Sequence, residues 1–355
     1  MSGEKQKVRI GFVGVGSMGQ AAHLRHYAQV PECEVVALAE VQQNLARKVA
    51  AKWGVPRVYA SHTEMLANEK LDGIVSAQQF TRHGTLMPEL LASGIPVLTE
   101  KPIAGSVEMG EKVLAAANAA KSWMMIAYHK RSDPASMAAM KEIARLRATG
   151  ELGKLTYIRI IMPAGDWIAN GFCQNEHGND PYPKLEWDPP ASDMDKETND
   201  AYITFVNYYI HQVNYMRYLL GETWKPVYAA ESGVQLSGVS ASGIACSLEM
   251  TPFQTSIDWQ EQALVCFEKG WLRITLPAPL TTNRAGKLEI FRDGGNGSVP
   301  RTEEWQMPWV GAMWQQARNF VAALQGERDI ACCSATDALE DLKFAREYIR
   351  IWKKK

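Results

Sequence analysis

The sequence lacks several features that would place a protein in a special class. Its six cysteines include no Cys-x-x-Cys pair, so neither a zinc site nor a disulfide framework is indicated, and we expect free, buried thiols and a reducing compartment. No apolar run has the length of a signal peptide or a membrane span, so we expect a cytoplasmic protein with no membrane partner. Lys plus Arg number 38 against 39 Asp plus Glu, and this balance gives no electrostatic reason to expect a nucleic acid partner.

What the sequence does contain predicts two domains. Its 355 residues, 46% of them hydrophobic, can bury a large core. Short β-branched runs alternate with helical patterns over residues 1–128, which predicts a doubly wound parallel sheet in an α/β domain. Longer strand-like runs separated by turns follow over residues 129–355, which predicts an α+β domain with a large, mostly antiparallel open sheet. Closing helices are expected at 313–324 and 336–353.

A glycine-rich loop follows the first predicted strand, 8–15, and precedes a predicted helix, 21–29. The stretch GFVGVGSMGQ places Gly14, Gly16 and Gly19 in G-x-G-x-x-G spacing. Gly14 permits a tight turn, Gly16 lets the backbone approach a pyrophosphate, and Gly19 allows close packing of helix on strand. The N-terminus of the helix adds N–H donors and a positive dipole end. The spacing also occurs in turns that bind nothing, so its context decides.

The second predicted strand, 35–39, supplies that context because it ends in Glu40. A carboxylate about 20 residues beyond the glycines can accept hydrogen bonds from an adenosine ribose, which predicts a dinucleotide-binding Rossmann domain. The same carboxylate repels a 2′-phosphate, and the next four residues, Val-Gln-Gln-Asn, include no arginine. NAD is therefore favoured over NADP, with Arg47 and Lys48 on the following helix as the cations that could reverse this preference.

The apolar strand pattern at 96–98 ends in charge, in the stretch LTEKP at 98–102. The carboxyl ends of parallel strands form the ligand crevice of an open sheet, so we expect Lys101 to point toward the nicotinamide. The alternative is that Glu100 and Lys101 form a solvated ion pair. Pro102 fixes the exit of the chain and gives the lysine a rigid base, which favours the functional interpretation.

Four further motifs accompany the glycine loop: LTEKP, YHKRSDP at 128–134, GELG at 150–153 and NYYIHQVN at 207–214. Together they resemble the glucose-fructose oxidoreductase and inositol dehydrogenase family (Gfo/Idh/MocA) over essentially the whole chain. The resemblance implies that Lys101 is catalytic and orients the substrate, and that His211 exchanges a proton with the reacting hydroxyl. It also implies cofactor contacts, in addition to the loop glycines and Glu40, from Ser17, Met18, Gln78, His83, Glu100, Lys101, His129 and Arg131.

The histidine of the last motif lies between two asparagines at helical spacing. Asn207, His211 and Asn214 stand at i, i+4 and i+7, which places them on one helix face that we expect to line the crevice. A lone histidine in an apolar helix is more often a satisfied core residue, but its polar companions and the resemblance favour a catalytic role. The family usually has Asp where this chain has Asn207, and asparagine can orient the imidazole only by hydrogen bonding. The stretch Gln78-Gln79-Phe80 also departs from the Thr-Pro-Asn of many members.

Residues 163–200 lack periodicity and are rich in Pro, Asp, Asn, Gly and Trp, which predicts a binding loop or lid. Asp166, Trp167 and His177 are its predicted substrate-binding residues, with Trp187 and Asp188 as further polar and aromatic groups suited to a sugar or cyclitol. The alternative is that the tryptophans cap the sheet. The segment contains no arginine cluster, which argues against a phosphorylated or acidic substrate.

These observations predict an NAD-dependent oxidoreductase that acts on a secondary hydroxyl of a sugar, glycoside or cyclitol, with C3 of a glycoside as one candidate position. We expect Lys101 and His211 to converge on the same carbinol, and Asn207 to assist. Two alternatives stay open: an enzyme that retains NAD, for aldose-aldose oxidoreduction or glycoside cleavage, and a non-catalytic dinucleotide-binding regulator. No metal site is predicted, and the resemblance implies a homodimer or homotetramer.

Overall fold

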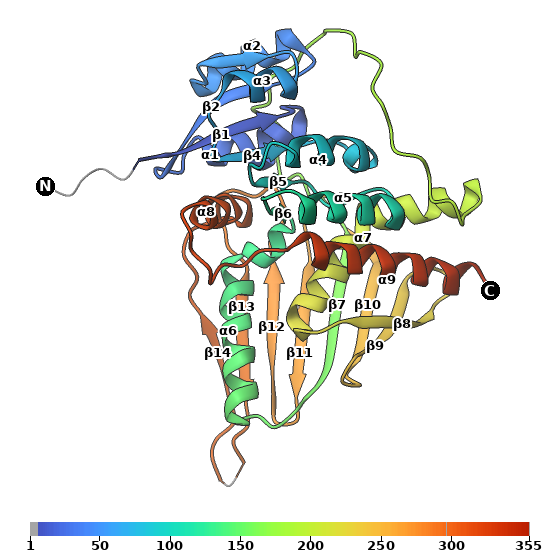
Figure 1. Ribbon diagram of the computed structural model, residues 1–355. Coiled ribbons are helices and arrows are strands. Elements are labelled where there is room, and N and C mark those ends of the chain that lie inside the picture. The colour runs from blue at the N-terminus through green and yellow to red at the C-terminus, as the bar shows by residue number, and fades with distance from the viewer. Residues whose placement is uncertain (1–5, 296, 355) are drawn as a thin grey trace, which may run out of the picture. The chain divides into compact units, whose positions relative to one another are not determined.

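The computed structural model describes residues 6–295 and 297–354, which divide into two compact units (Figure 1). Residues 1–5, 296 and 355, which belong to the two predicted domains, lie outside the described part. The first unit contains the chain up to Tyr128, and the second begins at His129. Two segments that were expected in the second domain, Asn170–Asp193 and Met313–Leu339, cluster with the first unit instead. Their side chains and carbonyls bond to or pack on that unit, as described below.

The first unit is built on a six-stranded parallel sheet of order β3-β2-β1-β4-β5-β6. Its strands run in parallel throughout, and the chain order reverses direction between β1 and β4, which is the switch point where open sheets of this kind bind ligands. The predicted parallel α/β domain is therefore confirmed. The strands are β1 (Val8–Val13), β2 (Cys33–Ala39), β3 (Arg57–Tyr59), β4 (Gly73–Ser76), β5 (Val97–Thr99) and β6 (Met124–Ile126).

Helices connect these strands, and short polar side chains begin several of them. Ser61 and Ser106 each accept a hydrogen bond from a backbone N–H in the first turn of the helix that follows, an N-cap arrangement that satisfies a free donor. The helix after the glycine loop ends at Tyr27, two residues earlier than expected. The helical elements are η1 (Gly19–Leu24), α1 (Arg25–Tyr27), α2 (Gln43–Trp53), α3 (His62–Asn68), η2 (Phe80–Arg82), α4 (His83–Leu91), α5 (Val107–Ala119) and α8 (Ala312–Leu324).

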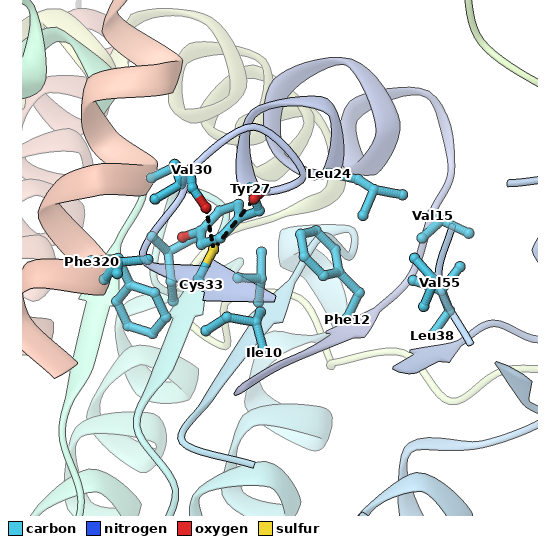
Figure 2. Packing of buried hydrophobic residues seen from close by; sticks show 14 of the residues in the cluster. Ile10, Phe12, Val15, Leu24, Tyr27, Val30, Cys33, Leu38, Val55 and Phe320 are labelled. Atoms are coloured by element: carbon cyan, nitrogen blue, oxygen red, sulfur yellow. Dashed lines mark hydrogen bonds between the residues drawn. The ribbon is translucent and has the colours of Figure 1, made fainter. Parts of the chain in front are cut away.

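The hydrophobic core of the first unit joins β1 to the helix after the glycine loop and to α8 (Figure 2). The rings of Phe12 and Tyr27 meet edge to face at 5.5 Å, and Tyr27 meets Phe320 of α8 at 6.4 Å. The thiol of Cys33 donates to the carbonyl of Tyr27 at 3.3 Å. Phe320 thus anchors the closing segment Met313–Leu339 to this unit.

His26 lies beside this core and makes the unit sensitive to acid. Burial, followed by the charges of Arg25 and His23, lowers the pKa of His26 to about 3. The unfolded histidine takes up a proton below about pH 6.5 while the folded one does not, so stability is complete above that pH and is lost as pH falls. We expect the free energy of unfolding to fall by about 2 kcal/mol more between pH 6.5 and 5 in the wild type than in His26→Gln. Urea titrations at both pH values measure the difference, and equal losses in the two proteins would contradict it.

The second unit is built on an eight-stranded sheet of order β14-β13-β12-β11-β7-β10-β9-β8. Neighbouring strands are antiparallel except β7 and β10, which run in parallel, so the predicted mostly antiparallel sheet is confirmed. The strands are β7 (Leu155–Ala164), β8 (Trp224–Ala229), β9 (Gln235–Ser240), β10 (Ala245–Gln254), β11 (Glu261–Phe267), β12 (Gly270–Leu276), β13 (Lys287–Arg292) and β14 (Arg301–Trp305).

Two strands, β9 and β14, were not expected. The sequence of β9, QLSGVS, has little apolar alternation, and β14, RTEEW, is a charged strand at the edge of the sheet, where polar residues discourage further pairing. The helical elements of this unit are η3 (His129–Ser132), α6 (Pro134–Thr149), α7 (Lys196–Leu220) and α9 (Ala335–Lys353), and α9 begins within the last residues of the first unit.

Two expectations from composition concern the state of the cysteines and the presence of membrane-spanning helices. All six cysteines are free, as expected, but Cys173 and Cys332 are exposed rather than buried, because both lie in irregular segments. Among the described residues, none of the helices combines the length and the apolar character needed to cross a membrane.

Candidate functional site

The glycine loop has the shape that a pyrophosphate requires. Gly14 has a φ of +91°, and a Cβ built on it would lie 2.7 Å from the carbonyl oxygen of Ala77. A Cβ on Gly19 would lie 2.6 Å from the carbonyl oxygen of Gly14, so helix and loop can pack this closely only without a side chain. A Cβ on Gly16 would meet nothing within 4 Å, so the space beside this backbone is open. The three glycines therefore fit a bound dinucleotide.

Glu40 lies directly after β2 and is bonded to the same loop. One carboxylate oxygen accepts the N–H of Val15 at 2.9 Å, and the other accepts the N–H of Gln42 at 3.0 Å. The side chain is buried, and each oxygen keeps a further lone pair with which it can accept a ribose hydroxyl. Glu40 therefore stabilises the loop as well as offering the acceptor predicted for it.

Lys101 follows Glu100, whose carboxylate is held by two hydrogen bonds. The Nε2 atom of His23 lies 2.7 Å from one Glu100 oxygen, and the backbone N–H of Lys101 donates to the other at 3.2 Å. Burial alone would raise the pKa of Glu100, but the hydrogen bond and charge of His23, together with the charge of Lys101, lower it below its usual value. The ionised carboxylate of Glu100 is thus bonded to the backbone of Lys101. His23 was not predicted, although it follows Gly19 by one helical turn.

His83 has a different role from the cofactor contact expected of it. Its side chain has no exposed surface, so it cannot touch a ligand in this arrangement. Nδ1 lies 3.1 Å from the carbonyl oxygen of Pro102, and Nε2 lies 3.3 Å from that of Gln78. Burial lowers the pKa of His83, so the ring is neutral at physiological pH. His83 positions the turn after Lys101.

Residues Asn170–Asp193, which we call the strap, cross the first unit beside α2 (Figure 1). Asn175 donates its amide to the carbonyl of Ser17 in the glycine loop at 3.1 Å, and the backbone N–H of Glu176 donates to the side chain of Gln20 at 2.8 Å. The strap is thus bonded to the backbone and side chains that follow the glycines. It contains part of the predicted binding loop, but it belongs to the first unit.

Two strap residues differ from their predicted roles. His177 is exposed, and its carbonyl accepts the ammonium of Lys48 on α2 at 3.0 Å, which places it beside the helix after β2 rather than in the second unit. Asp188 accepts the N–H of Gly84 at 2.8 Å and the hydroxyl of Thr85 at 2.9 Å. Its carboxylate therefore caps the first turn of α4.

A cavity of about 300 Å³ lies between the strap and the loop after β4. Arg82 spans one wall: its guanidinium donates to Gln78 at 3.0 Å and lies 5.9 Å from the ring of Trp187. Gln78, a predicted cofactor contact, thus faces a space that is large enough for a small ring. The lining residues are Gln78, Gln79, Arg82, Tyr182, Pro183, Leu185 and Trp187.

In the second unit, His211 lies on α7, as predicted, and is half-buried. Its ring meets that of His129 edge to face, with 4.8 Å between centroids. His129 is buried, as is Arg131 in the same short helix, η3. Arg131 donates to the side chain of Asn214 at 2.7 Å, and its guanidinium lies 5.1 Å from the ring of Tyr218. These contacts favour a structural role for Arg131 over the expected cofactor contact.

The polar face of α7 differs from the one expected. Asn207 is exposed and His211 is half-buried, but Asn214 is buried and donates to Asp341 of α9 at 2.6 Å. The face passes from solvent into the unit, because α9 packs against α7 at Asn214. Asn214 therefore fixes α7 and does not extend the candidate site.

The predicted substrate-binding residues are not brought together in one unit. Asp166 accepts the N–H groups of Ile168 at 3.0 Å and Ala169 at 2.9 Å through one oxygen, so it closes a turn after β7. Trp167 is half-buried next to it. Both belong to the second unit, whereas His177 belongs to the first. Within residues 6–295 and 297–354, no group of three or more His, Cys, Asp or Glu side chains is arranged to hold a metal ion.

The doubly wound sheet and its glycine loop define the class of the first unit as a dinucleotide-binding fold. Residues 8–128 match the oxidoreductase family with an NAD-binding Rossmann fold, Gfo/Idh/MocA. The match covers about a third of the chain, so the first unit is similar to that family, and over these residues the resemblance drawn from the motifs is confirmed.

Individual relatives agree with this assignment. The chain is 28% identical over 145 residues to inositol 2-dehydrogenase of Rubrobacter xylanophilus, covering 41% of this chain and 42% of that protein. It is 25% identical over 218 residues to the rhizopine catabolism protein MocA of Rhizobium meliloti, covering 61% and 58%. The matched parts thus span about half the length of these relatives. The crystal structure of aldose-aldose oxidoreductase from Caulobacter crescentus shares the fold, with a TM-score of 0.69, 18% identity and 98% of each chain covered.

Proposed function

We propose that this protein is an NAD-dependent dehydrogenase that transfers a hydride between nicotinamide and a secondary hydroxyl of a sugar, glycoside or cyclitol. The observation that carries the proposal is the open backbone at Gly16, next to the buried carboxylate of Glu40, within residues that match an NAD-binding family. The relative named inositol 2-dehydrogenase supports a cyclitol or a similar polyol as substrate.

The residues of the first unit have distinct roles in this proposal. The backbone N–H groups of Gly16, Ser17 and Met18 hold the pyrophosphate at the start of the helix, and Glu40 accepts the ribose hydroxyls. When bound, the nicotinamide supplies a hydride acceptor or donor. Lys101 places an ammonium where negative charge develops on the substrate oxygen.

His211 is the proposed general base for the hydroxyl proton. A positioned base contributes about 10²- to 10⁴-fold to such a reaction. The edge contact from His129 restricts the ring, and the bond from Arg131 to Asn214 fixes the helix one turn further along. Asn207, one turn before His211, orients substrate or imidazole as a neutral hydrogen-bonding group. Lys101 and His211 are proposed to serve the same carbinol.

A substrate panel tests the proposed function. NADH formation is followed at 340 nm with NAD and a set of polyols, aldoses and methyl glycosides, and with the phosphate ester of each active compound as its matched control. Because residues 163–200 contain no arginine, we expect turnover with at least one neutral polyol and at least tenfold less with its phosphate ester. Absence of turnover with every neutral compound, in a protein that binds NAD, would contradict a freely exchanging dehydrogenase.

A second candidate function is an enzyme that keeps its cofactor through the catalytic cycle. The bonds between the strap and the glycine loop favour it, because they tie a second segment to the backbone that is proposed to hold the pyrophosphate. The related structure from Caulobacter crescentus is that of an aldose-aldose oxidoreductase. In the same panel, NAD that stays with the protein through gel filtration, and oxidation of one sugar coupled to reduction of another without added NAD, would favour this candidate.

A further inference from the structure

The start of α2 is capped by a residue that the strap supplies. The N-cap residue of the helix itself, Gln42, makes no capping hydrogen bond with its side chain. Instead, the carboxylate of Asp180 accepts the backbone N–H of Asn44 at 2.6 Å and also bonds to the Asn44 side-chain amide. The carbonyl of Asp180 accepts the Gln42 amide at 2.8 Å. A negative charge is favourable there because of the helix dipole.

This position matters because α2 starts just beyond the predicted ribose acceptor, Glu40. A phosphate on the ribose 2′-oxygen would extend past Glu40 toward the free N–H groups of the next helix, which are good anion donors. Asp180 already bonds one of those donors, and its charge adds to that of Glu40. Two carboxylates therefore oppose a third anionic group.

The neighbouring cations are each held by a hydrogen bond that would have to break before they could bind a 2′-phosphate directly. The guanidinium of Arg47 donates to the side-chain oxygen of Asn44 at 2.5 Å, and the ammonium of Lys48 donates to the carbonyl of His177. These are the two cations that the sequence offered as partners for a 2′-phosphate. The strap thus binds one of them directly.

A second strap residue supports the placement next to the ribose acceptor. Burial, followed by the negative charge of Glu40, raises the pKa of Tyr182. The phenol therefore lies within electrostatic reach of the Glu40 carboxylate, two residues beyond Asp180 along the strap.

We propose that Asp180 is a specificity-determining residue, by which the strap excludes the 2′-phosphate of NADP from the start of α2. The inference rests on the proposed function, because it takes NAD as the cofactor. It differs from the role of Glu40, since Asp180 comes from a segment more than a hundred residues away in the chain. In this proposal, the preference for NAD over NADP depends both on Glu40, which follows β2, and on Asp180 of the strap.

Binding of nucleotide fragments tests this inference without any reaction. Calorimetric titrations compare 5′-AMP with adenosine 2′,5′-bisphosphate, and NADH with NADPH, on the wild type and on Asp180→Asn. We expect the variant to bind each 2′-phosphorylated ligand about tenfold more tightly and its partner ligand within about twofold of wild type. The gain should shrink as the salt concentration rises, because the effect is one of charge.

Glu186→Gln is the matched control, since it removes one negative charge from an exposed strap side chain that is not bonded to α2. It should leave both affinity ratios unchanged. Equal ratios in the wild type and Asp180→Asn would overturn the inference while NAD binding still supports the proposed function. A protein that binds neither NADH nor NADPH would overturn both.

Discussion

Replacing Lys101 with alanine is expected to lower turnover by about 10²- to 10³-fold while NAD still binds. The proposed role of the ammonium is to face the oxygen on which negative charge develops, and loss of one such group costs about 10²- to 10³-fold in comparable sites. The glycine loop and Glu40, which are proposed to hold the dinucleotide, do not depend on the Lys101 side chain. The comparison needs kcat with the active polyol of the panel and the Kd for NADH from calorimetry.

Lys112→Ala is the matched control for this variant because Lys112 is an exposed lysine of α5 in the same unit. Its kcat should equal that of the wild type. A Lys101→Ala protein with normal kcat would remove the catalytic assignment. One that loses NADH binding together with activity would show that the lysine holds the cofactor instead.

The fold of the first unit could be predicted from sequence because each of its strands and helices has a recognisable local pattern of apolar residues. Each strand is a short buried run, and each helix shows its own periodicity, so alternation alone predicts a parallel sheet. The glycine loop could also be predicted, since the backbone near Gly14 and Gly19 leaves no room for a side chain. The edge strand β14 was missed for the opposite reason: it pairs on one side only, and its charged residues carry no apolar signal.

The sequence predicts the strap only as part of an aperiodic segment. It does not predict which residues the strap contacts. Its bonds join irregular backbone to side chains such as Gln20 and Asn44, which are far away in the chain. Such pairs follow no spacing rule, so the sequence placed His177 and Asp188 among the substrate contacts, whereas the structure bonds them to α2 and α4. Local pattern predicts elements; it does not predict which element a loop will lie on.

The motif at 128–134 shows a third kind of limit. The resemblance implied cofactor contacts for its histidine and arginine, while the structure directs three consecutive residues toward α7 and its neighbours. His129 meets His211, Lys130 bonds to Glu261, and Arg131 bonds to Asn214. Helical spacing predicts that His211 lies on a polar helix face. It does not predict the contacts that hold this helix, because those contacts form between buried side chains far apart in the sequence. The motif therefore serves the second unit by fixing the helix that carries the proposed base.

Lys130→Met is expected to lower the free energy of unfolding of the second unit by about 3–5 kcal/mol. Lys130 and Glu261 are 4% and 1% exposed, and their charged atoms lie 2.5 Å apart. Without the ammonium, the carboxylate keeps the neutral donors Gln212 at 2.7 Å and Trp259 at 3.2 Å, so a buried charge is left without a cation. Urea unfolding followed by far-UV circular dichroism measures the loss.

Two further variants separate the buried charge from the loss of a lysine. Lys196→Met removes a lysine that is 89% exposed and pairs with Asp200 on the surface of α7, and it should cost about 0.5 kcal/mol or less. Lys130→Met combined with Glu261→Gln should regain at least half of the lost stability, because the amide carries no charge and its oxygen still accepts from Gln212, which donates to the carboxylate in the wild type. If Lys130→Met costs no more than Lys196→Met, the pair does not fix α7, and the positioning role given to this motif fails with it.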